Sequence, residues 1–266
     1  MFRKGIRPII AVAAACCCNQ VQTIQAAILF SGDYLENFDS LGATGTTLPA
    51  GWTAFRWSGS GTTGAPITPG ITAGTANSGG IYNTGAAGDP DRALGTLASS
   101  STVPVFGLQL LNNTGQDINS LYFTGTLEQW RSGSNANQDE SIVLEYSINA
   151  ASILDDQAQW SPLPDLNLNE LHTTSTSAGA LDGNHPENQQ ILNAELTGLV
   201  WSSDTTLSLR WFDSDNTGSD GLYALDNLRI QTPIAAVPEP ASTATLLIGL
   251  GCLGVLHQWR RKTPTH

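Results

Sequence analysis

Short segments in which apolar and polar residues alternate recur along most of this chain. The alternation is clearest at 142–148, 192–196, 207–211 and 222–230, and further apolar segments lie at 52–57, 103–111 and 120–130. A period of two is typical of half-buried β-strands, and no long segment carries the 3.6-residue stripe of an amphipathic helix. Within 222–230 the pattern predicts that Leu222, Ala224, Leu228 and Ile230 lie on one side of a strand.

The connections between these segments are rich in Gly, Ser, Thr, Asn and Asp, which suit turns. Two stretches are longer: 59–88, dense in Gly and Thr, and 165–190, which is polar. We expect loops with little core of their own in the first and a polar excursion in the second. Many short strands with turn-rich connections predict an all-β fold, an antiparallel jelly-roll-like β-sandwich.

The two ends of the chain differ from this pattern. At the start, Arg3, Lys4 and Arg7 precede an apolar segment at 9–18, and Ala26 or Ala27 offers a small residue for cleavage. These features predict a signal peptide helix over 1–27, removed by signal peptidase. The segment 13–16 also has some features of a lipoprotein box, which leaves lipidation as an alternative.

Near the other end, an uncharged segment at 241–259 is followed by three basic residues, Arg260, Arg261 and Lys262. As a helix this segment would extend about 28 Å, close to the thickness of a bilayer's hydrocarbon core. The sequence therefore predicts a single transmembrane helix with its basic end in the cytoplasm. Immediately before it lie Val237, Pro238, Glu239 and Pro240.

A Pro-Glu-Pro motif, a short membrane helix and a basic tail in this order resemble the PEP-CTERM sorting signal of Gram-negative bacteria. The resemblance covers 237–262 and divides the chain into a signal peptide, an extracytoplasmic domain over 28–236 and a sorting signal. It implies processing by an exosortase-type enzyme, an inner-membrane intermediate, and then a place at the cell surface or in the extracellular matrix. An ordinary tail anchor with a chance Pro-Glu-Pro is the alternative.

A second resemblance covers 38–230. The segments that carry it include Phe38-Asp39-Ser40-Leu41, Glu128-Gln129-Trp130-Arg131 and Asp220-Gly221-Leu222-Tyr223. They are similar to landmarks of a bacterial secreted β-sandwich module, found alone with a PEP-CTERM tail or beside nuclease and phosphatase domains. The module implies a fold and a location, and no established activity.

The charge of the domain restricts its partners. Of the 11 lysines and arginines, three lie in the signal peptide and three in the basic tail, so 28–236 keeps five arginines against 22 of the 23 acids. The resulting formal charge of −17 repels nucleic-acid phosphates and argues against DNA or RNA as partners. All four cysteines lie outside 28–236, so no disulfide stabilises the domain.

An Asp-rich segment before the last strand is a candidate calcium site. Asp213, Asp215 and Asp220 supply oxygens at spacings that resemble the start of a calcium-binding loop, but Ala224 stands where an EF-hand needs Glu. The sequence therefore excludes an EF-hand and leaves a shallower calcium site open. The alternative is a tight turn without metal.

Tryptophans and arginines give a second set of candidates. Most of the six tryptophans of the domain are expected in the core, with Trp57 and Trp160 the most exposed because they lie beside loop-like sequence. We expect Arg131 to form a bidentate pair with a carboxylate such as Glu145, Asp182 or Asp226. The alternative makes Trp130 a sugar-stacking platform beside Arg131.

No catalytic arrangement is evident. The nearest carboxylate group, Asp139, Glu140 and Glu145, has an unsuitable register, and the domain has only His172 and His185 and no nucleophile motif. The sequence therefore favours a non-catalytic exported module with exopolysaccharide as a candidate partner. An extracellular hydrolase of polysaccharide or phosphoester and a calcium-stabilised structural module are the alternatives.

Overall fold

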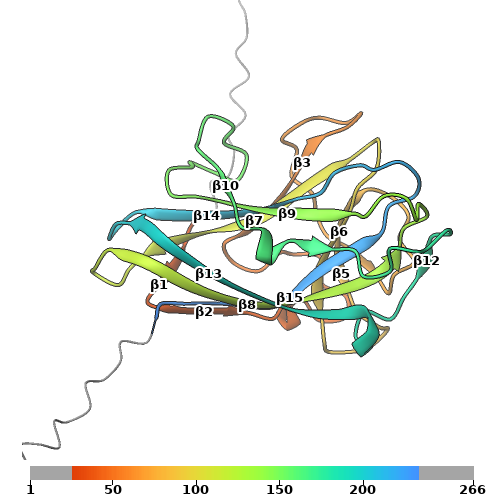
Figure 1. Ribbon diagram of the computed structural model, residues 1–266, viewed down its shortest axis with the longest axis horizontal. Helices are drawn as coiled ribbons and strands as arrows, with labels where there is room; N and C mark the ends of the chain where they lie inside the picture. The colour runs from red at the N-terminus through yellow and green to blue at the C-terminus, as the bar shows by residue number, and fades with distance from the viewer. Residues whose placement is uncertain (1–25, 234–266) are drawn as a thin grey trace, which may run out of the picture.

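The computed structural model describes residues 26–233, whose regular structure consists of fifteen β-strands and three short 3-10 helices. The strands form two sheets that lie one above the other (Figure 1). The helices are η1 (Asp39–Leu41), η2 (Pro164–Leu166) and η3 (Pro186–Asn188). No helix in this part of the chain is long and apolar enough to cross a membrane. The predicted signal peptide helix and transmembrane helix lie outside the described residues.

The first sheet is built around β7 and β14. Its strands are β1 (Ile28–Phe30), β7 (Val103–Asn112), β14 (Thr206–Phe212), β9 (Ser141–Ser147) and β10 (Ser161–Pro162) in that order, with β3 (Trp52–Ser58) also on β7 and β11 (Leu168–Asn169) also on β9.

The second sheet is built around β8 and β15. Its strands are β12 (Gly179–Ala180), β8 (Ile118–Ser132), β15 (Leu222–Gln231), β6 (Ala93–Leu97), β5 (Gly80–Thr84) and β4 (Gly70–Thr72) in that order, with β13 (Gln189–Trp201) also on β8 and β2 (Asp33–Glu36) also on β15.

The main core fills the space between the sheets. Alternation on β14 directs Leu207, Leu209 and Trp211 inward, where all three are fully buried. The rings of Trp52 and Trp211 are stacked at 5.9 Å, and Phe106 stacks on Trp211 at 5.5 Å. These contacts bury large aromatic areas and make the stack a major contributor to stability.

The all-β prediction is confirmed, and the seven segments named from the sequence lie in strands, except that Ile148 lies one residue past the end of β9. Most pairings are antiparallel, as predicted, but β1 pairs with β7 and β4 pairs with β5 in parallel. The antiparallel description is therefore incomplete at these two sheet edges.

The predicted apolar side of the last strand is wrong. Tyr223, Leu225, Leu228 and Ile230 point into the main core, whereas Leu222 packs in a second, smaller cluster. The reason is a β-bulge in β15: Asn227 has φ 51°, and the pairing with β8 shifts between Asp226 and Arg229. The extra residue reverses the phase of the alternation halfway along the strand.

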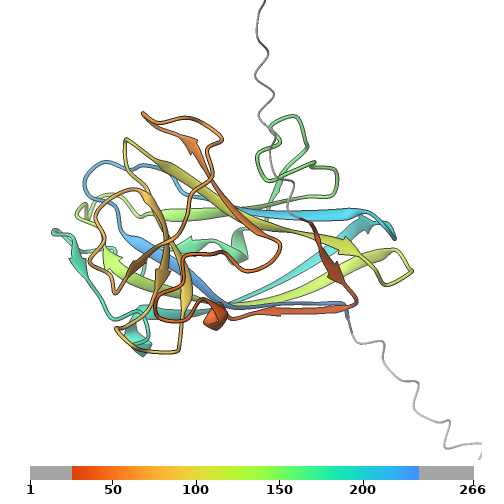
Figure 2. The ribbon, with the colours of Figure 1, turned by 180° about the vertical axis from the view of Figure 1, so that it is seen from behind.

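The prediction that 59–88 contains only loops is also wrong. This segment holds β4 and β5, and Ile81 of β5 is buried in the main core. Figure 2 shows the segment in orange and yellow at one end of the molecule. Isolated sequence does not reveal these strands because both are short, and one of them begins with Gly70 and the other with Gly80.

The smaller core lies on the opposite face of β8 and β15 and is centred on Trp130. Its buried members are Ala93, Leu97, Trp130, Leu222 and Ala224. Gly74 and Gly183 allow two loops to approach this ring: a Cβ on Gly183 would lie 2.3 Å from the indole, and one on Gly74 would lie 2.0 Å from the carbonyl oxygen of Trp130. The stretch 165–190 supplies one of these loops and also contains β11, β12, η3, the end of η2 and the start of β13. It is not a purely polar excursion, because Leu166 and Leu168 are buried in the main core.

Candidate functional site

The outer face of the first sheet carries an arginine between two tryptophans. Because Leu209 and Trp211 point into the core, Arg210 between them projects from the opposite face of β14. The register places Arg210 directly opposite Glu145 on β9. Arg210 donates from Nε and Nη2 to Glu145 Oε2 at 2.8 and 2.7 Å, which forms a charge-assisted pair.

The guanidinium of Arg210 also contacts both tryptophan rings. Its Cζ lies 3.8 Å from the ring centroid of Trp160 and 5.0 Å from that of Trp57. Trp57 in turn packs edge-on against Phe212. Arg210 is only 8% exposed, while both tryptophans are half-buried, so each retains accessible ring surface. We call Trp57, Glu145, Trp160 and Arg210 the aromatic platform.

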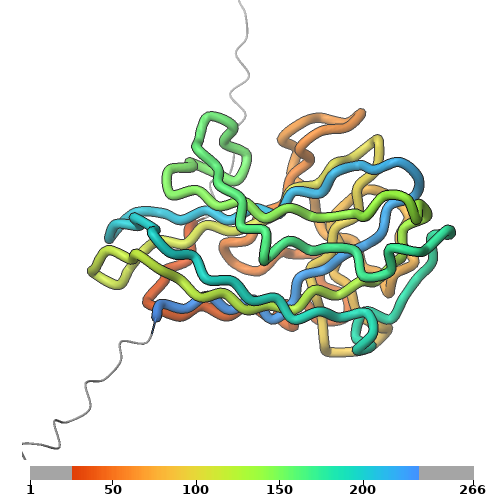
Figure 3. Tube along the Cα trace, in the orientation of Figure 1, coloured from red at the N-terminus to blue at the C-terminus, as the bar shows by residue number. Residues whose placement is uncertain are grey.

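The loop between β9 and β10 is fixed onto this face by the same residues. Figure 3 shows this loop, in green, rising from the same face as the orange loop after β3. Arg210 Nη1 donates to the carbonyl oxygen of Ile153, and Trp160 Nε1 donates to that of Asp155. Backbone amides of Ala151 and Gln157 donate to the Asp155 carboxylate and lower its pKa. The platform therefore has a defined geometry before any ligand binds.

The sequence-based prediction for the tryptophans is confirmed. Trp57 and Trp160 are the two partly exposed members, whereas Trp52, Trp130, Trp201 and Trp211 are fully buried. Trp130 donates from Nε1 to Glu128 Oε2 at 2.9 Å inside the smaller core. The alternative in which Trp130 is a sugar-stacking platform is therefore wrong, because the residue is only 1% exposed.

The predicted ion pair of Arg131 does not form. Across residues 26–233 the ion pairs are Arg210 with Glu145 and Arg229 with Asp33. Glu145, one of the predicted partners of Arg131, is already bound to Arg210. Arg131 lies at the end of β8 and lines a pocket instead.

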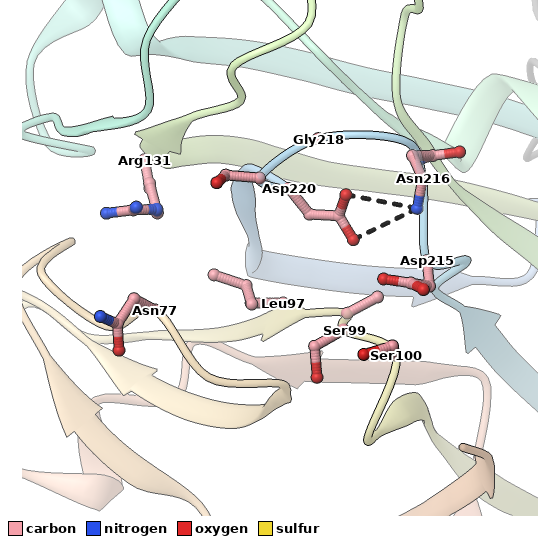
Figure 4. Close-up of a pocket in the computed structure, with 11 residues that line it drawn as sticks. Asn77, Leu97, Ser99, Ser100, Arg131, Asp215, Asn216, Gly218 and Asp220 are labelled. Carbon is pink, nitrogen blue, oxygen red and sulfur yellow. Dashed lines mark hydrogen bonds between the residues drawn. The ribbon is translucent and has the colours of Figure 1, made fainter. Parts of the chain in front are cut away.

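That pocket, which we call the terminal pocket, has a volume of about 280 Å³ and lies among the ends of strands from the second sheet. Its walls come from the turn after β6, from Arg131, and from the loop between β14 and β15. Figure 4 shows Arg131 on one side, Asp215 on the other and Asp220 between them, with Ser99 and Ser100 across the pocket. The lining is mostly polar.

Buried carboxyl groups lie behind this pocket. Asp220 is 7% exposed, and burial followed by the charge of Glu140 raises its pKa to about 7. Asp213 is 4% exposed, and burial raises its pKa well above the usual range even though Thr96 donates to it at 2.9 Å. Glu140 accepts hydrogen bonds from the Gly221 amide and the Tyr223 hydroxyl, yet burial also raises its pKa.

The structure places the three predicted calcium ligands in different surroundings. Asp213 is buried against Thr96, Asp215 is exposed, and Asp220 accepts only long hydrogen bonds from the Asn216 amide at 3.3 and 3.4 Å. Within the described part of the chain, no three or more His, Cys, Asp or Glu side chains are grouped so as to hold a metal ion. The calcium site therefore stays a prediction without geometric support.

The carboxylates considered for hydrolysis do not converge. Glu140 is buried and accepts a hydrogen bond from the Tyr223 hydroxyl. Glu145 lies on the outer face of the first sheet and pairs with Arg210. His172 Nε2 lies 2.6 Å from Asn188 Oδ1, which is a structural contact in the 165–190 stretch. These positions give no pair of acids flanking a common pocket.

A second pair of buried carboxyl groups escaped sequence reasoning. Glu128 and Asp226 lie on neighbouring strands and are each 2% exposed. Burial, with further contributions that include the charges of neighbouring acids, raises the pKa of Glu128 to about 7 and that of Asp226 to about 8. Local alternation carries no signal for this pair, because only the pairing of β15 with β8 brings the two residues onto neighbouring strands.

The fold defines an all-β protein with two sheets in a sandwich-like arrangement. No protein-family model and no curated protein matches the sequence. The sorting residues Val237, Pro238, Glu239 and Pro240 and the basic residues Arg260, Arg261 and Lys262 lie outside the described residues.

Several solved structures have a similar arrangement of strands. The K3 cleaved adhesin domain of Lys-gingipain from Porphyromonas gingivalis has a TM-score of 0.42 at 13% identity, over 75% of this chain and 98% of that one. The C-terminal family 22 carbohydrate binding module of Clostridium thermocellum Xyn10B has a TM-score of 0.38 at 9% identity, over 76% and 93%. Similarities of this size transfer no ligand or residue role to this chain.

Proposed function

We propose that this chain is an exported, exosortase-sorted protein of the cell surface or extracellular matrix whose β-sandwich binds polysaccharide without catalysis. The observation that carries the binding part is the aromatic platform, in which two partly exposed indoles flank the buried Arg210 and its partly exposed partner Glu145. The sorting part rests on the sequence of the two ends. Polysaccharide is the proposed ligand class because the platform combines ring faces with a hydrogen-bonding carboxylate.

The two kinds of group suit the two kinds of surface on a sugar. The C–H face of a pyranose packs on an indole, and its hydroxyl groups need acceptors and donors at the edge. Both hydrogen bonds from Arg210 reach Glu145 Oε2, so Oε1 has no donor among residues 26–233 and can accept one from a sugar hydroxyl. Trp57 lies near the end of β3 and Trp160 at the end of the β9–β10 loop, which lets one polysaccharide chain contact both rings.

The charge of the domain narrows the class of polysaccharide. A formal charge of −17 over 28–236 repels uronate-rich or sulfated polymers in solution. Neutral polymers and those with free amines carry no such penalty. We therefore expect retention by neutral or amino polysaccharides and little retention by polyanionic ones.

Replacing Trp57 or Trp160 with Ala should weaken binding to a neutral polysaccharide about tenfold for each ring, or about 1.4 kcal/mol. The measurement is affinity electrophoresis of the full-length protein, in mild detergent, through gels containing the host's exopolysaccharide or a neutral glucan. Tyr122→Ala is the matched control, because Tyr122 is 43% exposed on the outer face of the other sheet. Unchanged mobility shifts in both tryptophan variants would exclude the platform as the binding site.

Export and sorting make a separate prediction about the two ends of the mature protein. Mass spectrometry of protein from the native host should find an N-terminus near Ala27 or Ile28 and a C-terminus near 237–240. Deletion of the host's exosortase gene should leave the C-terminal segment attached. Protein that keeps Met1 and His266 and is recovered from the cytosol would contradict this part and leave the binding test unaffected.

A further inference from the structure

We propose that the terminal pocket binds a small zwitterion, a molecule that carries one carboxylate and one primary ammonium group. The pocket shares no lining residue with the aromatic platform, so this inference is independent of polysaccharide binding. A volume of about 280 Å³ fits one amino acid or one amino sugar.

Arg131 supplies the side of the pocket that recognises an anion. Within residues 26–233 its guanidinium makes no ion pair and no hydrogen bond, although the domain contains 22 acids. A half-buried guanidinium with no protein partner has its five donors free for a ligand carboxylate, which it can bind in a bidentate manner. In Figure 4 this group faces the pocket.

Asp215 on the other side and Asp220 between it and Arg131 supply the opposite charge (Figure 4). Asp215 is exposed, and among residues 26–233 the Asp220 carboxylate accepts only the long hydrogen bonds from the Asn216 amide. Neither carboxylate forms an ion pair with Arg131, so opposite charges are held apart across the pocket.

This separation selects a ligand with both charges. A bare cation would leave Arg131 without a partner and would be repelled by it, and a bare anion would meet two carboxylates in a domain of charge −17. A zwitterion pairs with both sides at once. Leu97 and Ala98 give the pocket an apolar portion for the carbon skeleton, and Ser99 and Ser100 offer hydroxyl groups beside it.

Binding is also expected to depend on pH near neutrality. Burial, followed by the charges of Glu140 and Asp215, raises the pKa of Asp220 to about 7. Asp213 lies behind Asp220 and Arg131 lies across the pocket, and these groups complete the charged surroundings. Because Asp220 takes up a proton as the pH falls from 8 to 6, the ammonium end of the ligand loses one of its two partners.

The test is isothermal titration calorimetry of the full-length protein at pH 8. Alanine and muramic acid are the zwitterions, and they separate an amino acid from an amino sugar as the source of this chemistry. Glucosamine, glucuronate and Ca²⁺, added as calcium chloride, are the controls, because each offers the pocket only a positive or only a negative charge. At least one zwitterion should bind ten times tighter than each of these three, and its affinity should fall severalfold at pH 6.

Variants separate the roles of the two sides. Arg131→Gln and Asp215→Asn should each remove the tenfold preference, and Asp215 is exposed enough that its variant will fold. Arg229→Gln, an arginine on another surface, should keep it. Three results would each overturn the proposal. They are equal or tighter binding of calcium or glucosamine, a preference for the zwitterion that survives Arg131→Gln, and the absence of binding by either zwitterion.

Discussion

Lowering the pH from 8 to 5 is expected to stabilise the folded domain and to raise its Tm by about 5–10 °C. The reason is the set of buried carboxyl groups with raised pKa: Glu128 and Asp220 at about 7, Asp226 at about 8, and Asp213 well above its usual range. Carboxylates that are paired in the folded state act in the opposite direction, because they destabilise the fold when they are protonated.

The sign follows from proton counting. In the unfolded chain these acids titrate near pH 4. In the folded domain Glu128, Asp220 and Asp226 keep their protons up to about pH 7 or 8, and the pKa of Asp213 is also raised. Between these values the folded state binds more protons, so the free energy of unfolding falls as the pH rises. Below about pH 4 both states are protonated and the effect ends. Arg229 lowers the pKa of Asp33, and backbone amides lower that of Asp155, so these two acids favour folding at higher pH. Both carboxylates lie at the surface, where the effect on stability is small.

Differential scanning calorimetry between pH 5 and pH 8 gives the measurement. Asp220→Asn should raise the Tm at pH 8 and flatten its pH dependence, because Asn keeps an acceptor for the Asn216 amide without the buried charge. Asp204→Asn makes the same change of charge at an exposed position, so it should alter neither the Tm at pH 8 nor the pH dependence of the Tm. A Tm that rises steadily from pH 5 to pH 8 would contradict the expectation.

Local alternation predicted the strands that form the middle of both sheets. On β14 each apolar residue of the pattern points into the core, and on β9 Ile142 and Leu144 do so because both strands are regular. Ile148 lies just past the end of β9 and is exposed. On β15 the same reasoning failed, since Asn227 in a left-handed conformation inserts an extra residue and changes which side chains face the core. A bulge of this kind leaves no periodic signal in the sequence.

The candidate site was only partly predictable for a related reason. The exposure of Trp57 and Trp160 follows from the loop-like sequence beside each of them. The contact of both rings with Arg210 cannot be inferred from the sequence beside them, because it depends on the path of the β9–β10 loop. Trp57 and Trp160 are also more than a hundred residues apart in the chain. The terminal pocket likewise combines the end of β8 with two distant loops, so Arg131 was assigned to a neighbouring carboxylate instead.

Replacing Arg210 with Ala is expected to have the largest effect on the proposed binding function. The change removes both hydrogen bonds to Glu145, the bond to the Ile153 carbonyl and the cation–π contacts with Trp57 and Trp160. The β9–β10 loop then loses the bond from Arg210 to Ile153 and keeps the one from Gln109 on β7 to the Ala150 carbonyl. We expect polysaccharide retention to fall to the level of a double variant lacking both tryptophans, with a loss of about 2–3 kcal/mol in stability.

Arg229→Ala provides the matched comparison for stability. Arg229 also forms a bidentate pair, with Asp33, but the two side chains are 46% and 51% exposed, and pairs of that kind contribute about 0–1 kcal/mol. Urea unfolding should therefore separate the two variants clearly. Arg210→Lys keeps the charge and loses the planar group, so it should recover part of the stability and little of the binding.

The two readouts distinguish a structural arginine from one that organises a binding surface. If Arg210→Ala lowers the unfolding free energy but leaves polysaccharide retention unchanged, the Arg210 contacts only anchor the β9–β10 loop, and the platform is not the binding site. Loss of retention in Arg210→Lys at nearly normal stability would show that the guanidinium plane, held between the indoles, sets the spacing of the two rings. That spacing is what would select one polysaccharide from another, because successive sugar units must meet both rings.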